Sequence, residues 1–159
     1  MNKIQFRAWY PEKQKMYEVA KVDMWGDPDQ AVCDLASNDE ELFDIYLNEV
    51  ETMQYIGIKD KYGREICEGD IIQTYFSFSP GDAGYGVSQK PFIVKWEQGR
   101  AGFRAYKPNA KALHLLDVID FFDMQSKLYE IIGNIYENPE LLKQNVVQHR
   151  GAYTADTRN

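Results

Sequence analysis

The chain has few of the residues that specialised chemistry requires. Its 159 residues include two histidines and two cysteines. Cys33 and Cys67 are too few for a disulfide framework and lack metal-ligand spacing, so we expect both to be reduced residues of the interior. The sequence contains no run of about eighteen apolar residues, which is the length that a membrane-spanning helix needs. The N-terminus lacks the apolar core of a signal peptide. We therefore expect a cytoplasmic protein with no membrane segment.

Candidates for catalysis or metal binding are correspondingly weak. A nucleophilic triad would have to use His114, in an apolar stretch, or His149, near the C-terminus. Asp27 and Asp29 have the opening spacing of a calcium loop, but no glycine and closing glutamate follow at the required offsets. We expect no catalytic residue, no metal site and no cofactor, and hence a protein that is not an enzyme.

What the chain does contain is aromatic residues and an uneven charge. Aromatics make up 14% of the sequence, which favours strands because flat side chains pack well on a pleated surface. The net charge of −7 discourages nonspecific binding to nucleic acid. Residues 27–51 hold nine acids and no base, whereas residues 52–111 hold nine bases and six acids. The acidic segment has two interpretations, a solvated face or a docking surface for a basic partner.

The N-terminal region reads as a hairpin followed by an insert. Residues 4–10 and 16–22 are predicted strands around a polar turn, with Ile4, Phe6 and Ala8 alternating toward one buried face. Residues 39–51 show both helical and strand spacing. We favour a short helix or an irregular insertion there, and the alternative of a strand stays open.

The pattern from residue 53 onward indicates a small barrel. Strand, turn, short strand, turn and strand follow one another within 53–77, and residues 92–106 read as a hairpin. The glycine-rich composition of residues 79–90 predicts a mobile loop. The segment lacks the Gly-Lys-Ser/Thr ending of a phosphate-binding loop. Residues 112–124 fit an amphipathic turn or a short helix. Residues 128–137 are the last predicted strand, and Pro139 begins a short helix.

Two segments carry a resemblance to a known family. MQYIGIKDKYGREICEGDII at 53–72 and IIGNIYENPELL at 131–142 resemble the blocks that characterise the YopX family, small proteins of bacteriophages and prophages. FRAWY and KQKMYEV near the N-terminus also match the way such proteins begin. Cys67 and Ile56 depart from the pattern, at positions where an aromatic residue and a threonine are usual.

The resemblance implies a mainly β protein with an N-terminal hairpin region and a C-terminal SH3-like small barrel, with short helical segments. We accordingly divide the chain into a hairpin and acidic insert (1–52), a barrel (53–143) and a flexible tail (144–159). It also implies self-association, and it brings no catalytic residue. The conserved-looking motif residues are then structural, the glycines for positive φ angles and the polar residues for turn hydrogen bonds. These residues are Gly57, Gly63, Gly69, Asp70, Gly133, Asn134 and Pro139.

The function expected from these features is that of a phage or prophage accessory protein without enzymatic activity. It would bind proteins, both copies of itself and an unidentified host or phage protein. The alternative is a barrel that binds single-stranded nucleic acid by stacking bases on exposed aromatics beside cations. The residues that would make this contact are Lys95, Trp96, Arg100, Phe103, Arg104 and Lys107.

Overall fold

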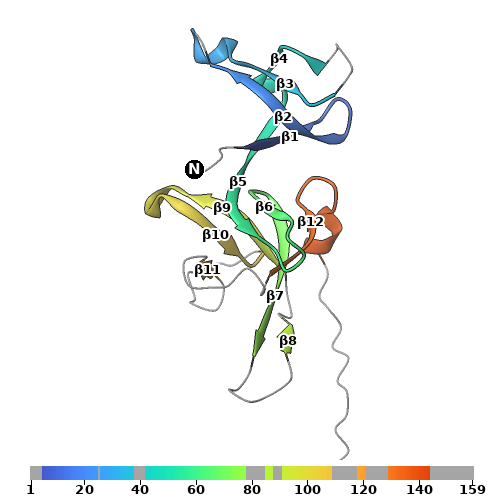
Figure 1. The fold of residues 1–159 in the computed structure, drawn as a ribbon, viewed down its shortest axis with the longest axis vertical. Helices are drawn as coiled ribbons and strands as arrows, with labels where there is room; N and C mark the ends of the chain where they lie inside the picture. The colour runs from blue at the N-terminus through green and yellow to red at the C-terminus, as the bar shows by residue number, and fades with distance from the viewer. Residues whose placement is uncertain are drawn as a thin grey trace, which may run out of the picture.

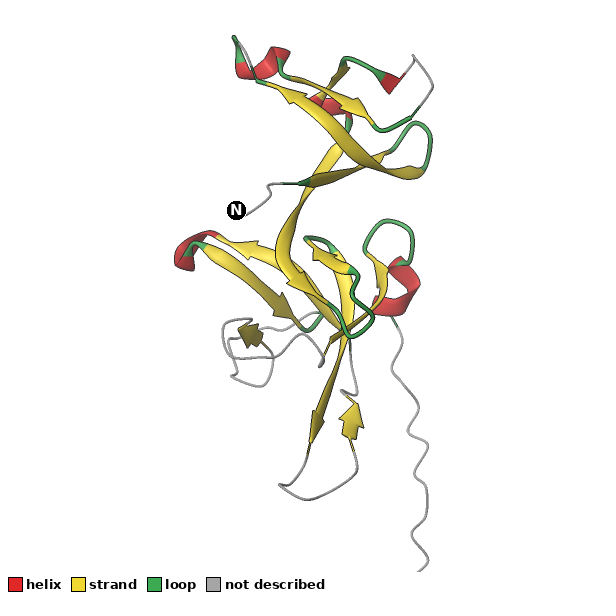
Figure 2. Ribbon diagram, in the orientation of Figure 1, coloured by secondary structure: helices red, strands yellow, loops and turns green. Residues whose placement is uncertain are grey.

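Antiparallel strands make up most of the described chain, so the prediction of a mainly β fold is confirmed (Figure 2). The computed structural model describes residues 5–24, 26–37, 42–77, 85–87, 91–108, 118–120 and 129–143. Its helical segments are single 3-10 turns: η1 (Pro28–Gln30), η3 (Leu47–Glu49), η4 (Gln98–Arg100) and η7 (Pro139–Leu142). None of the helices within the described residues has the length and apolar character needed to cross a membrane.

The strands form two sheets (Figure 1). The first has the order β4-β3-β2-β1-β5-β6, and the second has the order β11-β10-β9-β7-β12, with β8 paired to β7. The strands of the first sheet are β1 (Phe6–Tyr10), β2 (Lys15–Asp23), β3 (Val32–Leu35), β4 (Ile45–Tyr46), β5 (Glu51–Lys59) and β6 (Glu65–Cys67). The strands of the second are β7 (Asp70–Ser77), β8 (Tyr85–Val87), β9 (Phe92–Glu97), β10 (Gly102–Tyr106), β11 (Val118–Asp120) and β12 (Tyr129–Asn134).

The molecule has two halves, the first built from β1 to β4 with the start of β5 and the second from the end of β5 to β12 (Figure 1). Strand β5 runs through both halves. Its first residues pair with β1, and its later residues pair with β6. The register with β6 shifts between Tyr55 and Lys59, and Gly57 lies inside this interval with a φ of 80°. A left-handed residue in a strand bends it, and glycine adopts that conformation without a steric penalty. Gly57 therefore lies where β5 turns from the first half into the second.

Each half has its own apolar cluster. In the first half, strands β1, β3 and β4 bury the side chains of one face, with Leu42 and Val50 beside them. In the second half, one cluster collects residues from β6, β7, β9, β10 and β12, with two partly buried residues of β5. Its fully or nearly buried members are Ile66, Ile72, Phe92, Val94, Ala105 and Tyr129. Strands surrounding one interior in this way form a small barrel-like body.

Strand β1 differs from the sequence prediction, because both of its faces are buried. Ala8 and Tyr10 belong to the first cluster, as the alternation indicated. Trp9, which the alternation assigned to the other face, is only 8% exposed and packs with Met53 and Cys67. A central strand that separates two packed layers loses the simple alternation of buried and exposed residues. This third cluster joins the two halves.

Three further local predictions need comparison with the structure. Within 42–51 the chain forms the two-residue strand β4 and one 3-10 turn, which fits an irregular insertion rather than a helix, because Leu42, Ile45 and Val50 all belong to the first cluster. The glycine-rich segment 79–90 contributes β8 rather than only a loop, and the predicted turn or helix at 112–124 contains β11. The remaining residues of both segments, with the tail 144–159, His114 and His149, lie outside the described residues.

The outer edge of β12 is closed by the turn between β5 and β6. The Lys61 N–H donates to the Tyr129 carbonyl at 2.8 Å. Arg64 donates through Nη2 to the Ile131 carbonyl at 2.7 Å, and the Ile131 N–H donates to Asp60 Oδ2 at 3.3 Å. The side chains of Arg64 and Asp60 thus supply the donor and the acceptor that a neighbouring strand would otherwise offer to Ile131.

The carboxylate of Asp60 holds this turn together. It accepts hydrogen bonds from the backbone N–H groups of Tyr62 and Arg64, each at 2.9 Å, and from Arg64 Nε at 2.8 Å. Burial by itself would raise the pKa of Asp60, but the bonds from Arg64, Ile131 and Tyr62 outweigh it and leave the pKa lowered. The ionised carboxylate is therefore the form that the fold stabilises.

The pKa of Asp60 predicts part of the acid sensitivity of the fold. Because the folded pKa lies below the ordinary value, the stabilisation is complete above that ordinary pKa and is lost as the pH falls through the folded pKa. Replacing Asp60 by asparagine should cost about 1–3 kcal/mol of unfolding free energy at neutral pH, and this cost should shrink on acidification. Urea unfolding at several pH values measures it. The exposed Glu49→Gln serves as the control, and a cost for Asp60→Asn that did not change with pH would contradict the assignment.

Candidate functional site: the polar junction and the aromatic hairpin

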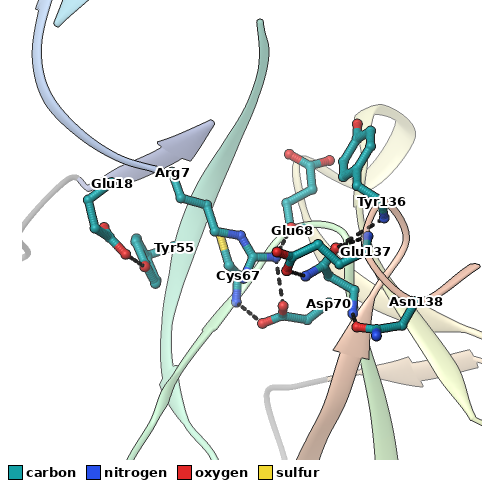
Figure 3. Close-up of polar contacts among 10 residues, drawn as sticks. Arg7, Glu18, Tyr55, Cys67, Glu68, Asp70, Tyr136, Glu137 and Asn138 are labelled. Atoms are coloured by element: carbon teal, nitrogen blue, oxygen red, sulfur yellow. Dashed lines mark hydrogen bonds and ion pairs between the residues drawn. The ribbon is translucent and has the colours of Figure 1, made fainter. Parts of the chain in front are cut away.

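The two halves meet at an ion pair between β1 and the first residue of β7 (Figure 3). Arg7 Nη2 lies 2.6 Å from Asp70 Oδ1, and the same nitrogen donates to the Glu68 carbonyl at 3.2 Å. The side chains are 12% and 1% exposed, respectively. The other carboxylate oxygen of Asp70 accepts the Cys67 N–H at 2.8 Å. The Asp70 carboxylate thus closes the turn that begins at Cys67 and also binds Arg7 in the other half of the molecule.

Local backbone geometry places Asp70 at this point. Gly69 precedes it with a φ of 78°, a left-handed conformation that the tight turn requires. A Cβ on Gly69 would also lie 3.2 Å from the Met53 sulfur. The Gly69 N–H donates to the Val94 carbonyl, and its carbonyl accepts the Ile135 N–H. The Glu-Gly-Asp turn is therefore fixed against β9 and against the turn that follows β12.

Burial governs the protonation of this junction. It raises the pKa of Asp70, and the charge of Arg7 and the Cys67 N–H oppose the increase. Burial also raises the pKa of the Cys67 thiol to about 12, so that the thiol stays protonated at neutral pH. Cys33 shows a raised pKa for the same reason. Both cysteines are free and buried, and neither has the thiolate character of a nucleophile.

Apolar and aromatic contacts flank the ion pair. The rings of Trp9 and Tyr136 stack with centroids 5.8 Å apart and an angle of 15° between their planes. On the other side, the Tyr55 hydroxyl donates to Glu18 Oε1 at 2.6 Å, linking β5 to β2. Figure 3 shows Tyr136 on one side of the Arg7–Asp70 pair and Tyr55 with Glu18 on the other. The junction therefore combines a buried charge pair with a stacked aromatic pair.

The last motif, Gly133-Asn134, forms a second rigid turn beside the first. Asn134 Oδ1 accepts the N–H groups of Tyr136 and Glu137, and the Asn134 N–H donates to Asn138 Oδ1 at 3.2 Å (Figure 3). Gly133 does not have the positive φ that the sequence suggested. Its requirement is space, because a Cβ there would lie 2.5 Å from Asn138 Oδ1.

The remaining motif residues lie in turns at some distance from the ion pair. Gly63 has a φ of 83° in the turn between β5 and β6. Pro139 is at the start of η7, a 3-10 helix of four residues that Asn138 precedes without a side-chain cap. The signal that sequence reasoning missed is Asp60, whose side chain organises this turn and the edge of β12. Its place in the same Lys-Asp-x-x-Gly block as Gly63 could have identified it.

The residues proposed to contact nucleic acid do not form one basic surface. Trp96 is 48% exposed and meets Phe103 edge to face, with ring centroids 4.9 Å apart. Arg104, however, is 7% exposed and forms an ion pair with Glu97. Lys107 lies over the ring of Phe92, 5.8 Å from its centre. Lys95 remains exposed beside Trp96, and Arg100 lies in η4.

Most polar groups of the junction bind one another, whereas the buried Arg7 Nε has no hydrogen-bond partner among the described residues. Both oxygens of Asp70 accept hydrogen bonds, and Arg7 is neutralised by it. Across the part of the chain that the structure describes, no three His, Cys, Asp or Glu residues come together as a metal site would require. Asp27 Oδ1 accepts the Asp29 N–H at 3.1 Å, which is turn chemistry. The arrangement is suited to holding two bodies together.

A double-mutant cycle tests the energetic role of the junction. Arg7→Met or Asp70→Asn alone should lower the unfolding free energy by about 3–5 kcal/mol, because each leaves a buried partner without its counter-charge. The double variant should cost clearly less than the sum of the two. Lys59→Met is the matched control, since its 3.9 Å pair with Glu65 is exposed and contributes about 0–1 kcal/mol. Additive costs in urea unfolding would contradict a direct interaction.

Comparison with known proteins agrees with the sequence resemblance. The model of the YopX protein family matches residues 5–143. Among solved structures, the crystal structure of protein EF1440 from Enterococcus faecalis is similar at 24% sequence identity, with a TM-score of 0.46. The match covers 89% of this chain and 99% of that one. No curated protein matches the sequence. Because the family model spans most of the chain, this protein belongs to the YopX family.

Proposed function

We propose that the protein is a non-enzymatic accessory protein of a phage or prophage that acts by binding protein chains, copies of itself included. The family resemblance supports the phage setting. Support for protein binding comes from the surface, where large aromatic side chains remain exposed in both halves. Such residues are enriched where proteins contact one another.

One observation carries this proposal, namely the open edge of the first sheet. Strand β4 is the last strand of that sheet, and within the described residues its only strand partner is β3. Tyr46 on β4 is 49% exposed, and Phe43 just before it is 44% exposed. The edge of β12, by contrast, is closed by Asp60 and Arg64. Since the fold closes the β12 edge with side chains, the β4 edge, which has no second strand partner among the described residues, is suited to a partner beside its two aromatic residues.

The interior of the junction supports a binding role over a catalytic one. Its carboxylate and guanidinium are buried and paired with each other, and the Cys67 thiol is buried as well. A catalytic group has to reach its substrate, whereas these groups connect strands. We therefore assign the junction to the scaffold and the binding to the exposed edge.

Size-exclusion chromatography with light scattering tests self-association. We expect the mass to rise above that of the monomer as concentration increases from micromolar toward millimolar. Phe43→Ser/Tyr46→Thr should weaken the association by about tenfold or more, as removal of interface aromatics commonly does. Tyr62→Ala, which removes a 66% exposed aromatic elsewhere, should leave it unchanged.

Two results would overturn the proposal. A strict monomer over the whole concentration range would eliminate self-association. Salt-sensitive binding of single-stranded DNA that Trp96→Thr abolishes would replace protein binding with the nucleic-acid alternative. Absence of such binding at low salt would remove that alternative.

A further inference from the structure

Each half of the molecule is one continuous stretch of chain with an interior of its own. The apolar cluster of the first half takes its described members, buried and partly buried, from the residues between Ala8 and Val50. The cluster of the second half takes its described members from the residues between Ile56 and Ile131. The chain passes from one half to the other along β5 (Figure 1). Each half can therefore keep its interior when it separates from the other.

The junction joins the halves through contacts between residues that precede Gly57 and residues that follow it. Arg7 forms the ion pair with Asp70, and Trp9 stacks on Tyr136. The other contacts join Met53 to Cys67 in the third cluster and the Gln54 carbonyl to the Glu68 N–H at 2.9 Å. Apart from the connection through β5, the junction is non-covalent, so the first half of a second copy can make the same contacts.

The strand that connects the halves bends at Gly57. Its φ of 80° lies in the left-handed region, and the pairing of β5 with β6 shifts register around it. A Cβ at this position would have no atom within 4 Å, so no neighbouring side chain crowds the backbone there. Glycine adopts left-handed and extended conformations about equally readily. Gly57 is therefore suited to act as a hinge at which β5 straightens.

Straightening β5 would uncover the junction surfaces of both halves. Arg7 would lose Asp70, and the buried side chains of Trp9, Met53 and Cys67 would meet water. Loss of a buried ion pair and of buried apolar contacts is unfavourable. A second straightened copy offers both again with matching shape and charge, because its junction surfaces are the same residues.

We propose that Gly57 is a hinge at which two copies of this chain exchange their first halves, so that Arg7 of each copy pairs with Asp70 of the other. The contacts of the exchanged dimer are those of the closed chain, formed twice between the two copies. This inference goes beyond the proposed function, because it uses the junction and leaves the β4 edge unoccupied. Since the junction must open first, the exchanged dimer forms on refolding at high concentration rather than on mixing folded chains.

Refolding two junction variants together tests the exchange. Arg7→Met and Asp70→Asn each leave one buried charge unpaired in every junction, whether the chain is closed or exchanged with its own kind. An exchanged dimer with one copy of each variant has one junction with both charges and one junction with neither. After joint refolding from urea, with one variant isotope-labelled, the mixed dimer should exceed the unmixed dimers by about tenfold or more in native mass spectrometry.

A control pair alters charges that the exchange does not touch. Lys59→Met and Glu65→Gln each remove one partner of an exposed ion pair that lies wholly within the second half. Refolded together in the same way, these two variants should form mixed dimers only in the statistical proportion.

A second test leaves every junction residue in place. Valine disfavours the left-handed conformation and favours an extended strand, so Gly57→Val should promote the straight form of β5. The association constant of the exchanged dimer should rise about tenfold or more, because two hinges are relieved in each dimer. Gly63→Val is the matched control, since Gly63 has a φ of 83° and equally open surroundings but lies in a turn of the second half. It should lower stability without raising the amount of dimer.

The outcomes separate the exchange from association at the β4 edge. A Gly57→Val variant that gains no more dimer than Gly63→Val, or a mixed dimer in only the statistical proportion, would overturn the exchange and leave the edge proposal standing. The edge variant Phe43→Ser/Tyr46→Thr should still exchange, because β4 lies at the far end of the first sheet. Association of folded chains that this edge variant leaves unchanged would overturn the edge proposal and leave the exchange standing.

Discussion

The Arg7–Asp70 ion pair is the interaction on which the arrangement of the two halves depends. It joins residues 63 positions apart in the sequence and is almost inaccessible to water. Removing two charges from water is costly, and their attraction offsets that cost only when the geometry is good and the remaining polar atoms are satisfied. Here Asp70 also accepts the Cys67 N–H and Arg7 also donates to the Glu68 carbonyl, although the buried Arg7 Nε has no partner among the described residues. Such a pair specifies one orientation of the first sheet against the barrel-like body, which the stacking of Trp9 on Tyr136 reinforces.

Much of the fold could be predicted from local sequence. Strands β5, β6 and β7 follow from runs of strand-forming residues and from the glycines of the turns between them, because these signals lie within a few residues of the structure they determine. The long-range consequences could not be predicted. Asp70 reads as a turn residue in the sequence, and nothing local reveals that Arg7 is its partner. The alternation along β1 predicts an outward-facing Trp9, because one-sided burial is the usual rule for an antiparallel strand, whereas Trp9 packs against Met53 and Cys67.

The candidate site shows the same division between local and distant signals. Gly63 and Gly69 have the positive φ angles that their turns require, whereas Gly133 is needed for the space beside Asn138. The basic aromatic stretch looked uniform in sequence, but the sheet turns Arg104 inward to Glu97 and leaves Trp96 exposed. That separation makes the hairpin a small mixed surface rather than a basic one.

A junction of this kind should make the two halves one cooperative unit. Native-state hydrogen exchange measures cooperativity directly, because it reports the free energy of opening at each backbone amide. We expect the most protected amides of β1 and β2 to exchange with the same opening free energy as those of β7 and β9. Two clearly separated values, with the first sheet opening while the barrel-like body stays closed, would contradict it.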